Sequence, residues 1–159
     1  MRSESFSDRT RTARAAAPYA TASRRQRNRA RMAMGYLYLN AFLYLLFALW
    51  CTALPSNTAL NIGYLALSSG GQSEYLVVYG GLQLGLAILF YLLARNMAHV
   101  RLGVTVALGL YGPVVIYRVV TVLSHSPVGG VTLGTAVLEF ALLAGAIWSY
   151  LALRHLPER

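Results

Sequence analysis

Four apolar stretches, each about as long as a membrane-spanning helix, dominate this chain of 159 residues. They cover residues 34–54, 75–94, 102–123 and 131–153, and almost every position in them is uncharged. A helix needs roughly 20 apolar residues to cross the hydrocarbon layer of a bilayer. Every backbone polar group must be hydrogen-bonded internally there, which a long helix achieves. The sequence therefore predicts an all-α integral membrane protein, folded as a four-helix transmembrane bundle.

The overall composition agrees with this class. The chain is 57% hydrophobic and only 12% charged, whereas an ordinary soluble domain carries about 25% charged residues. We expect one transmembrane domain over residues 34–153, followed by a short basic tail at 154–159. Residues 1–33 are polar and rich in Arg, Ser and Ala, without hydrophobic periodicity. They are predicted to form a disordered or loosely ordered N-terminal tail.

The arginines predict how the bundle is oriented. They lie before the first span, between the second and third spans (Arg95 and Arg101) and after the fourth (Arg154 and Arg159), while the other two loops contain none. Basic residues favour the cytoplasmic side of a membrane. Both termini are thus predicted to be cytoplasmic, in a bacterial inner membrane. The alternative is the matrix side of the mitochondrial inner membrane, because the acid-poor N-terminal stretch also has the composition of a transit peptide.

A cluster of arginines directly precedes the first span: Arg24, Arg25, Arg27, Arg29 and Arg31. Each basic residue near an anionic leaflet adds about 1 kcal/mol of attraction. We expect these residues to bind anionic lipids, or alternatively to dock onto an acidic face of a larger membrane complex. Nucleic acid is not an expected partner, because no nucleic-acid-binding fold or aromatic pattern accompanies the charge.

Two charged residues interrupt the apolar spans. Arg118 is expected roughly 8 Å inside the outer end of the third span, and Glu139 roughly 12 Å inside the same end of the fourth. A charge at a helix centre costs roughly 2.5–3.5 kcal/mol on insertion scales, so the two are predicted to pair. Glu74 and His125 are expected near the same outer surface. The pair is either purely structural or part of a cavity that binds a polar headgroup or moves a proton.

Small residues recur where the helices are expected to touch. Close approach through such residues holds helices together in lipid, and Pro113 is expected to kink the third span. The predicted helix-packing positions are Gly81, Gly85, Gly112, Pro113, Ala141 and Gly145. Packing within the bundle is favoured over a self-association face. The apolar loop segment 59–67 is too short to span and is expected to lie in the membrane interface.

The residue inventory argues against several kinds of chemistry. Cys51 is the one cysteine in the sequence, so it cannot form an internal disulfide, and it offers no zinc site. His125 has no Cys or Asp close to it in the sequence. We therefore expect no metal and no cofactor, and no residue is assigned a catalytic role.

An ordered set of residues resembles a known family. An acidic residue opens the second span ahead of a Tyr-Gly pair (Glu74, then Tyr79 with Gly80), an Arg lies near the outer end of the third span, and a Glu lies in the fourth. This arrangement is similar to that of a group of small bacterial four-helix membrane proteins of unknown function. The resemblance covers the second to fourth spans, about half the chain. It implies the fold and a membrane location, and it implies no activity.

Three functions remain open from the sequence. The first is a non-enzymatic accessory or scaffold subunit that packs against a larger membrane complex or against itself. The second is a binding or carrier bundle for a lipophilic molecule, such as a quinone or isoprenoid, whose headgroup meets Arg118, Glu139 and Glu74. The third is a membrane enzyme with Glu139 as a general acid, which Arg118 would oppose by favouring the ionised carboxylate.

Overall fold

The computed structural model describes residues 24–125 and 127–154, and each regular element in these ranges is helical. The elements in chain order are α2 (Arg24–Ala53), α3 (Pro55–Ile62), α4 (Ser69–Tyr75), the π-helical η1 (Leu76–Leu82), α5 (Gln83–Ala94), the 3-10 turn η2 (Met97–His99), α6 (Val100–Ser124) and α7 (Gly130–Leu153). Four continuous helical segments are long and apolar enough to cross a membrane: Arg24–Ala53, Ser69–Ala94, Met97–Ser124 and Gly130–Leu153. The chain is a multi-pass helical membrane protein, as predicted.

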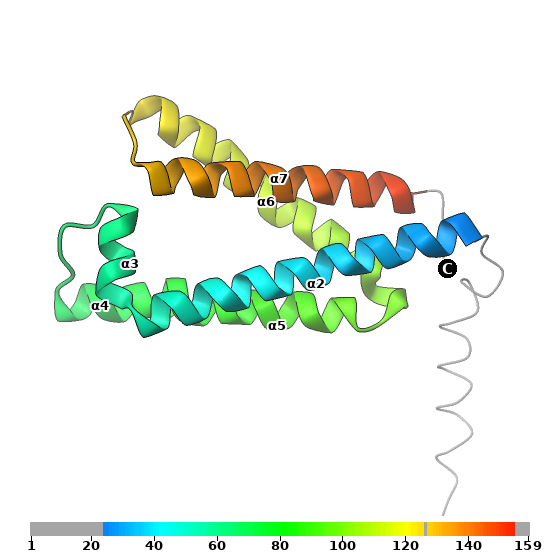
Figure 1. The fold of residues 1–159 in the computed structure, drawn as a ribbon, viewed down its shortest axis with the longest axis horizontal. Helices are drawn as coiled ribbons and strands as arrows, with labels where there is room; N and C mark the ends of the chain where they lie inside the picture. The colour runs from blue at the N-terminus through cyan, green and yellow to red at the C-terminus, as the bar shows by residue number, and fades with distance from the viewer. Residues whose placement is uncertain (1–23, 126, 155–159) are drawn as a thin grey trace, which may run out of the picture.

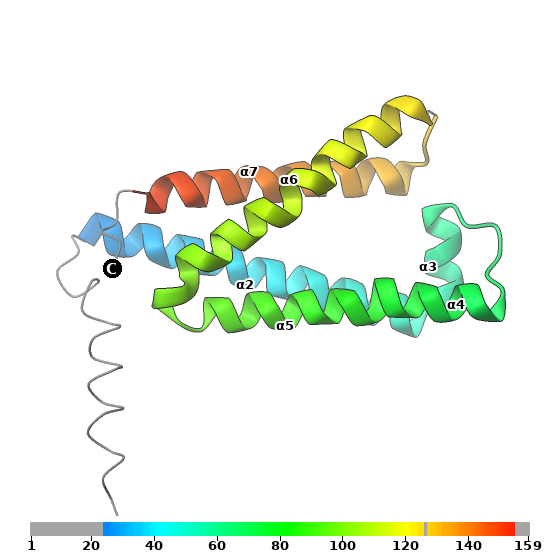
Figure 2. The same cartoon turned by 180° about the vertical axis from the view of Figure 1, so that it is seen from behind.

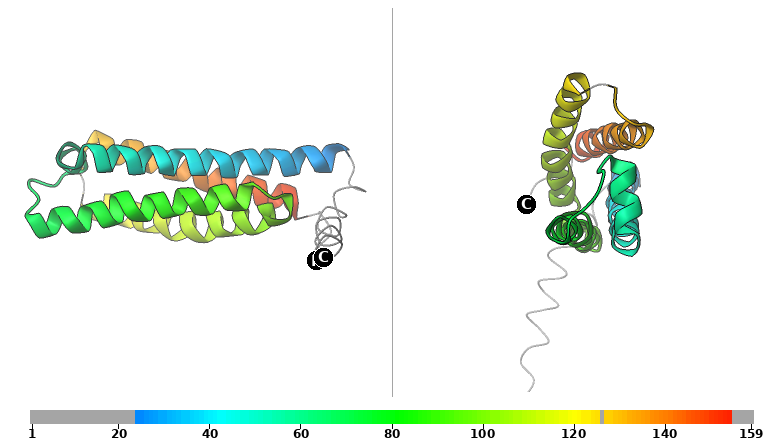
Figure 3. Two further views of the ribbon diagram at one scale, coloured as in Figure 1. Left: turned by 90° about the horizontal axis from the view of Figure 1, so that it is seen from below. Right: turned by 90° about the vertical axis from the view of Figure 1, so that its left-hand side faces the viewer.

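The four spans form two layers, α2 with α5 and α6 with α7 (Figure 1). Neighbours within each layer run antiparallel, and α2 contacts each of the other three spans. We call the end of the bundle that carries the arginines at the start of α2 and Arg95 after α5 the basic end. Seen from behind, α6 lies close to α5 at the basic end and diverges from it toward the opposite end (Figure 2). We call that opposite end, which carries the loops at 54–68 and 125–129, the far end. The end-on view of Figure 3 shows the same two layers.

The first helix begins earlier than the sequence predicts. Within the described residues it covers Arg24–Ala53, so the prediction of a loosely ordered tail is wrong for residues 24–33. Arg, Gln, Ala and Met are good helix formers, and extending an existing helix avoids the cost of nucleation. Ala30 and Ala33 are also fully buried in the core of the bundle. The remainder of the predicted tails, residues 1–23 and 155–159, lies outside the described residues.

Apolar side chains fill the contact between the two layers. The main core cluster joins α2, α5, α6 and α7 and includes the fully buried Leu37, Phe90, Val100 and Val104 together with the almost fully buried Leu153. Large apolar side chains also cover the outside of the spans, with Val137 70% and Leu123 78% exposed. Extended apolar surface of this kind faces the acyl chains of a bilayer rather than water.

The loop between the first two spans folds over the far end of the bundle. Helix α3 lies across the end of α2 (Figure 1), and Gly63, at φ 115°, ends it in the left-handed conformation that glycine adopts without strain. The predicted interfacial segment 59–67 thus includes the second half of α3. Tyr75 fixes this arrangement, because its hydroxyl donates to Thr58 Oγ1 at 2.9 Å.

Gly145 and Gly103 lie where helices come closest. A Cβ at Gly145 would come within 2.8 Å of the ring of Tyr36, and one at Gly103 would come within 2.5 Å of Leu37. The prediction that Gly145 serves helix packing is therefore confirmed. Such distances are shorter than van der Waals contact, so a larger residue at either position would require Tyr36 or Leu37 to shift.

The other predicted packing positions behave differently. Gly85 and Gly112 have no atom within 4 Å of an added Cβ, and Gly81 has only the backbone oxygen of Leu76. Ala141 is exposed. The spacing of small residues fixes which of them share a face of a helix, but it does not fix which face the bundle buries. Helix α6 includes Pro113 without interruption.

Candidate functional site

Arg118 and Glu139 form a two-pronged ion pair between α6 and α7. Arg118 Nε donates to Glu139 Oε2 at 2.7 Å, and Nη2 donates to Oε1 at 2.7 Å. The side chains are 27% and 18% exposed. The predicted pairing is confirmed, and it uses the parallel fork geometry that makes Arg–carboxylate contacts strong.

The local fold explains why the two residues meet. Helices α6 and α7 are antiparallel neighbours joined by residues 125–129. Arg118 lies six residues before the end of α6 at Ser124, and Glu139 lies nine residues after the start of α7 at Gly130. At 1.5 Å per residue these positions are roughly 9 Å and 14 Å from the far end, a difference that the long Arg side chain spans.

Three tyrosines lie within electrostatic range of the ion pair. Arg118 influences Tyr79 on η1, and Glu139 influences Tyr44 on α2 and Tyr111 on α6. The ring of Tyr44 stacks on that of Tyr111, with centroids 6.5 Å apart. Tyrosines of α2, η1 and α6 are therefore within electrostatic range of a pair contributed by α6 and α7.

A second polar group, which we call the Asn40 network, lies deeper in the bundle. It consists of Tyr36, Asn40, Tyr111 and the backbone oxygen of Leu142. The hydroxyl of Tyr111 donates to Asn40 Oδ1, Asn40 Nδ2 donates to the backbone oxygen of Tyr36 at 2.8 Å, and the Tyr36 hydroxyl donates to Leu142 O at 2.8 Å. Asn40 is fully buried. The network ties α2 to both α6 and α7.

Sequence reasoning did not find the Asn40 network, although a signal for it was present. Tyr36, Asn40 and Tyr44 are spaced four residues apart, which places them on one face of a helix. A polar face within an apolar span indicates that it points to the interior of the bundle. Tyr36 also lies near the start of the first apolar stretch, a position that by itself is typical of an interfacial tyrosine.

The other two predicted site residues lie apart from the pair. Glu74 is an exposed residue of α4, and within the described part of the chain it makes no ion pair. His125 follows the end of α6, where its Nδ1 lies 3.1 Å from the backbone oxygen of Thr121. Among residues 24–125 and 127–154, no three His, Cys, Asp or Glu side chains are grouped so that they could hold a metal ion.

At the far end, side chains from η1 and from the end of α4 form a compact cluster against α2. Tyr75 and Tyr79 stack with ring centroids 4.6 Å apart, and the Tyr75 hydroxyl lies 3.6 Å from the sulfur of the buried Cys51. A Cβ at Gly80 would meet Thr52 Oγ1 at 2.7 Å. Gly80, rather than Gly81, thus permits the close contact between η1 and α2.

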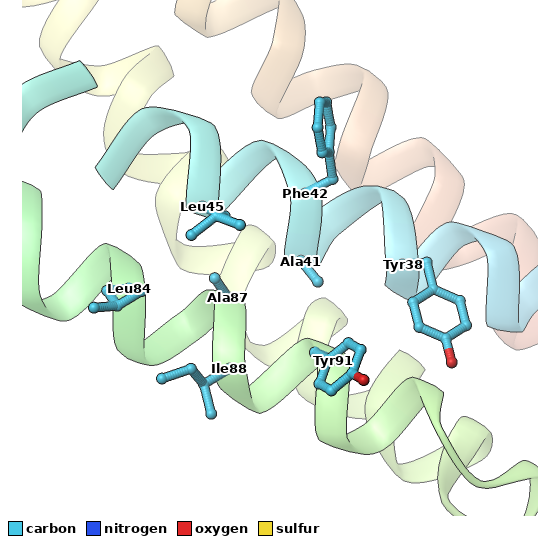
Figure 4. A pocket seen from close by; sticks show the side chains of 8 residues that line it. All are labelled: Tyr38, Ala41, Phe42, Leu45, Leu84, Ala87, Ile88 and Tyr91. Carbon is cyan, nitrogen blue, oxygen red and sulfur yellow. The ribbon is translucent and has the colours of Figure 1, made fainter. Parts of the chain in front are cut away.

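An apolar groove of about 330 Å³ lies on the outer face between α2 and α5. Figure 4 shows its lining, with the bodies of α6 and α7 behind. The residues are Tyr38, Ala41, Phe42, Leu45, Leu84, Ala87, Ile88 and Tyr91. Tyr38 and Tyr91 meet edge to face, with centroids 6.1 Å apart.

The predicted lipid-binding arginines Arg24, Arg25, Arg27, Arg29 and Arg31 are all exposed on the first turns of α2. Arg95, which follows α5, lies at the same end of the bundle, and its guanidinium carbon is 5.7 Å from the centre of the Tyr91 ring.

Comparisons with protein-family models, curated proteins and solved structures find no match to this chain.

Proposed function

We propose that this chain is a non-enzymatic accessory or scaffold subunit that packs against a larger complex in a bacterial inner membrane. The observation that supports it best is the closed Arg118–Glu139 pair, in which both carboxylate oxygens accept short hydrogen bonds from one guanidinium. Such a pair fixes two helices against each other and leaves neither oxygen directed at a substrate.

The Asn40 network supports the same role. Asn40 and Tyr111, buried within the bundle, hydrogen-bond each other, and Asn40 also donates to the backbone. In the described part of the chain, the buried side-chain polar atom without a hydrogen-bond partner is Ser149 Oγ. Polar groups that satisfy one another specify how helices pack, and a scaffold requires a single, well-defined packing.

An enzymatic role for Glu139 has less support. A general acid must lie within hydrogen-bond reach of the substrate atom that it protonates. Both oxygens of Glu139 are already engaged with Arg118, and Glu74 and His125, which were expected near the same surface, lie apart from the pair. A reaction at this site would first have to break the pair.

A carrier role for a lipophilic molecule, such as a quinone or isoprenoid, is the second candidate. Two observations favour it: the pair is not fully buried, at 27% and 18% exposure, and Tyr79 lies within electrostatic range of Arg118. Tyr79 belongs to the π-helical η1, and π-helical turns are frequent at functional sites. A polar headgroup could therefore meet the pair from the side of η1.

The decisive experiment compares one double variant with one single variant. Arg118→Met with Glu139→Leu replaces the pair by apolar groups of similar size, which is often neutral for stability, whereas Glu139→Leu alone leaves an unpaired guanidinium. Each variant is extracted in mild detergent, and mass spectrometry identifies the co-purifying proteins and small molecules. Val137→Ala, at a position 70% exposed on the same helix, is the matched control.

A scaffold predicts that a membrane-protein partner co-purifies with the wild type, the double variant and the control, and is lost with Glu139→Leu. A carrier predicts instead a lipophilic compound that the double variant loses while it stays folded. Recovery of the wild-type chain as a monomer without partner or ligand would contradict both roles.

A further inference from the structure

One face of α2 carries arginines that lead directly to the apolar groove. Arg24, Arg27 and Arg31 are followed by Gly35, Tyr38, Phe42 and Leu45, with successive spacings of three or four residues. Residues so spaced lie on one face of a helix. Gly35 leaves the surface between Arg31 and Tyr38 open, because an added Cβ there would meet nothing within 4 Å.

Helix α5 provides the same pattern on the other wall of the groove. Leu84, Ile88, Tyr91 and Arg95 are spaced by three or four residues. The Tyr38–Tyr91 contact sets the relative height of the two walls. Arg31 lies seven residues before Tyr38, or roughly 10 Å toward the basic end. Arg95 lies four residues after Tyr91, or roughly 6 Å in the same direction. Both walls thus end in an arginine at the same end.

Nothing acidic in the described residues offsets this charge. Glu74 and Glu139 are the acidic residues of ranges 24–125 and 127–154, and both belong to the far half of the bundle. Within those ranges, neither Arg31 nor Arg95 has an ion-pair partner. The mouth of the groove is therefore basic, and its interior is apolar.

We propose that this groove is a binding site for an anionic phospholipid of the leaflet at the basic end. One acyl chain lies in the groove, and the phosphate meets Arg31 and Arg95, with Arg27 next along the same face. The combination of a basic mouth and an apolar interior matches a molecule that joins an anionic group to an apolar chain, as a phospholipid does.

The test uses the purified full-length chain in neutral detergent. Native mass spectrometry counts the bound lipids at increasing concentrations of phosphatidylglycerol or of phosphatidylcholine with the same acyl chains. Arg31→Gln with Arg95→Gln removes the two arginines at the mouth. Arg25→Gln with Arg29→Gln is the matched control, because it removes equal charge from exposed positions on another face of the same helix.

We expect phosphatidylglycerol to bind more tightly than phosphatidylcholine, and the mouth variant to weaken its binding by about fivefold per arginine, with little change in the control. Ile88→Trp, at a lining position 52% exposed, should reduce binding of both lipids by filling the groove. Equal losses in the mouth variant and the control would show only general surface attraction and overturn the site. So would equal binding of the two lipids, or unchanged binding in Ile88→Trp. This inference does not depend on the scaffold role.

Discussion

Alanine at position 145 would place a methyl group against the ring of Tyr36. The added Cβ would lie 2.8 Å from Cε2 and 3.1 Å from Cδ2 of that ring. Tyr36 cannot swing aside freely, because its hydroxyl donates to the backbone oxygen of Leu142, one turn away on the same helix as Gly145. Either α7 moves away from α2, or Tyr36 rotates and loses this hydrogen bond.

The structure gives the size of the effect. Overpacking of a well-packed core costs about 1–3 kcal/mol, and a lost hydrogen bond costs about 0.5–1.5 kcal/mol. Replacing glycine by alanine within a helix stabilises the folded state by about 0.5–1 kcal/mol, which offsets part of this cost. We therefore expect Gly145→Ala to lower the free energy of unfolding by about 1–3 kcal/mol, measured by denaturant unfolding of the chain in detergent micelles.

Gly134→Ala is the matched control for this variant. Gly134 lies on the same helix, and an added Cβ there meets nothing within 4 Å. The control should therefore be neutral or stabilising by up to about 1 kcal/mol. A second check is Tyr36→Leu, in whose background Gly145→Ala should cost less because the clash is gone. If Gly145→Ala and Gly134→Ala unfold alike, the close α2–α7 approach through Gly145 is refuted.

Three further variants test the polar contacts and the close contact of η1 with α2 at Gly80. Asn40→Leu removes the acceptor for the buried Tyr111 hydroxyl and should destabilise the bundle by about 1–3 kcal/mol. Adding Tyr111→Phe to this variant should partly restore the free energy of unfolding, measured in the same way. Gly80→Ala should lower the thermal midpoint, because its Cβ would meet a side chain of α2 at 2.7 Å, while Gly81→Ala should leave it unchanged. Glu139→Leu alone leaves its guanidinium partner unpaired and should cost about 3–5 kcal/mol; an unaltered midpoint would contradict the structural importance of the pair.

The fold was predictable because the bilayer imposes it. Twenty or so apolar residues in a row have few alternatives to a spanning helix, and the structure has four such helices. The ends of the helices were harder to predict. The first helix extends back to Arg24 because Ala30 and Ala33 find buried contacts, and these depend on how α2 packs on other helices. A pattern read along one helix does not contain that information.

The candidate site was predictable where an unpaired charge would be too costly. Arg118 and Glu139 had to meet, since each would otherwise sit alone within an apolar span. No such constraint acts on Glu74, which is exposed at the far end. The Asn40 network was missed because uncharged polar residues cost less in a membrane than charges do, and because its partner on α7 is a backbone oxygen, which no side-chain pattern reveals.

Helix α2 carries the two kinds of contact on nearly opposite faces. Tyr36, Asn40 and Tyr44 point to the interior polar groups, while Arg31 and Tyr38 lie on the face of the outer groove. At 100° per residue, Tyr38 is about 160° around the helix from Asn40. Substitutions on the groove face therefore leave the interior hydrogen bonds in place. Lipid binding and bundle stability are consequently separable properties, because each depends on a different face of one helix.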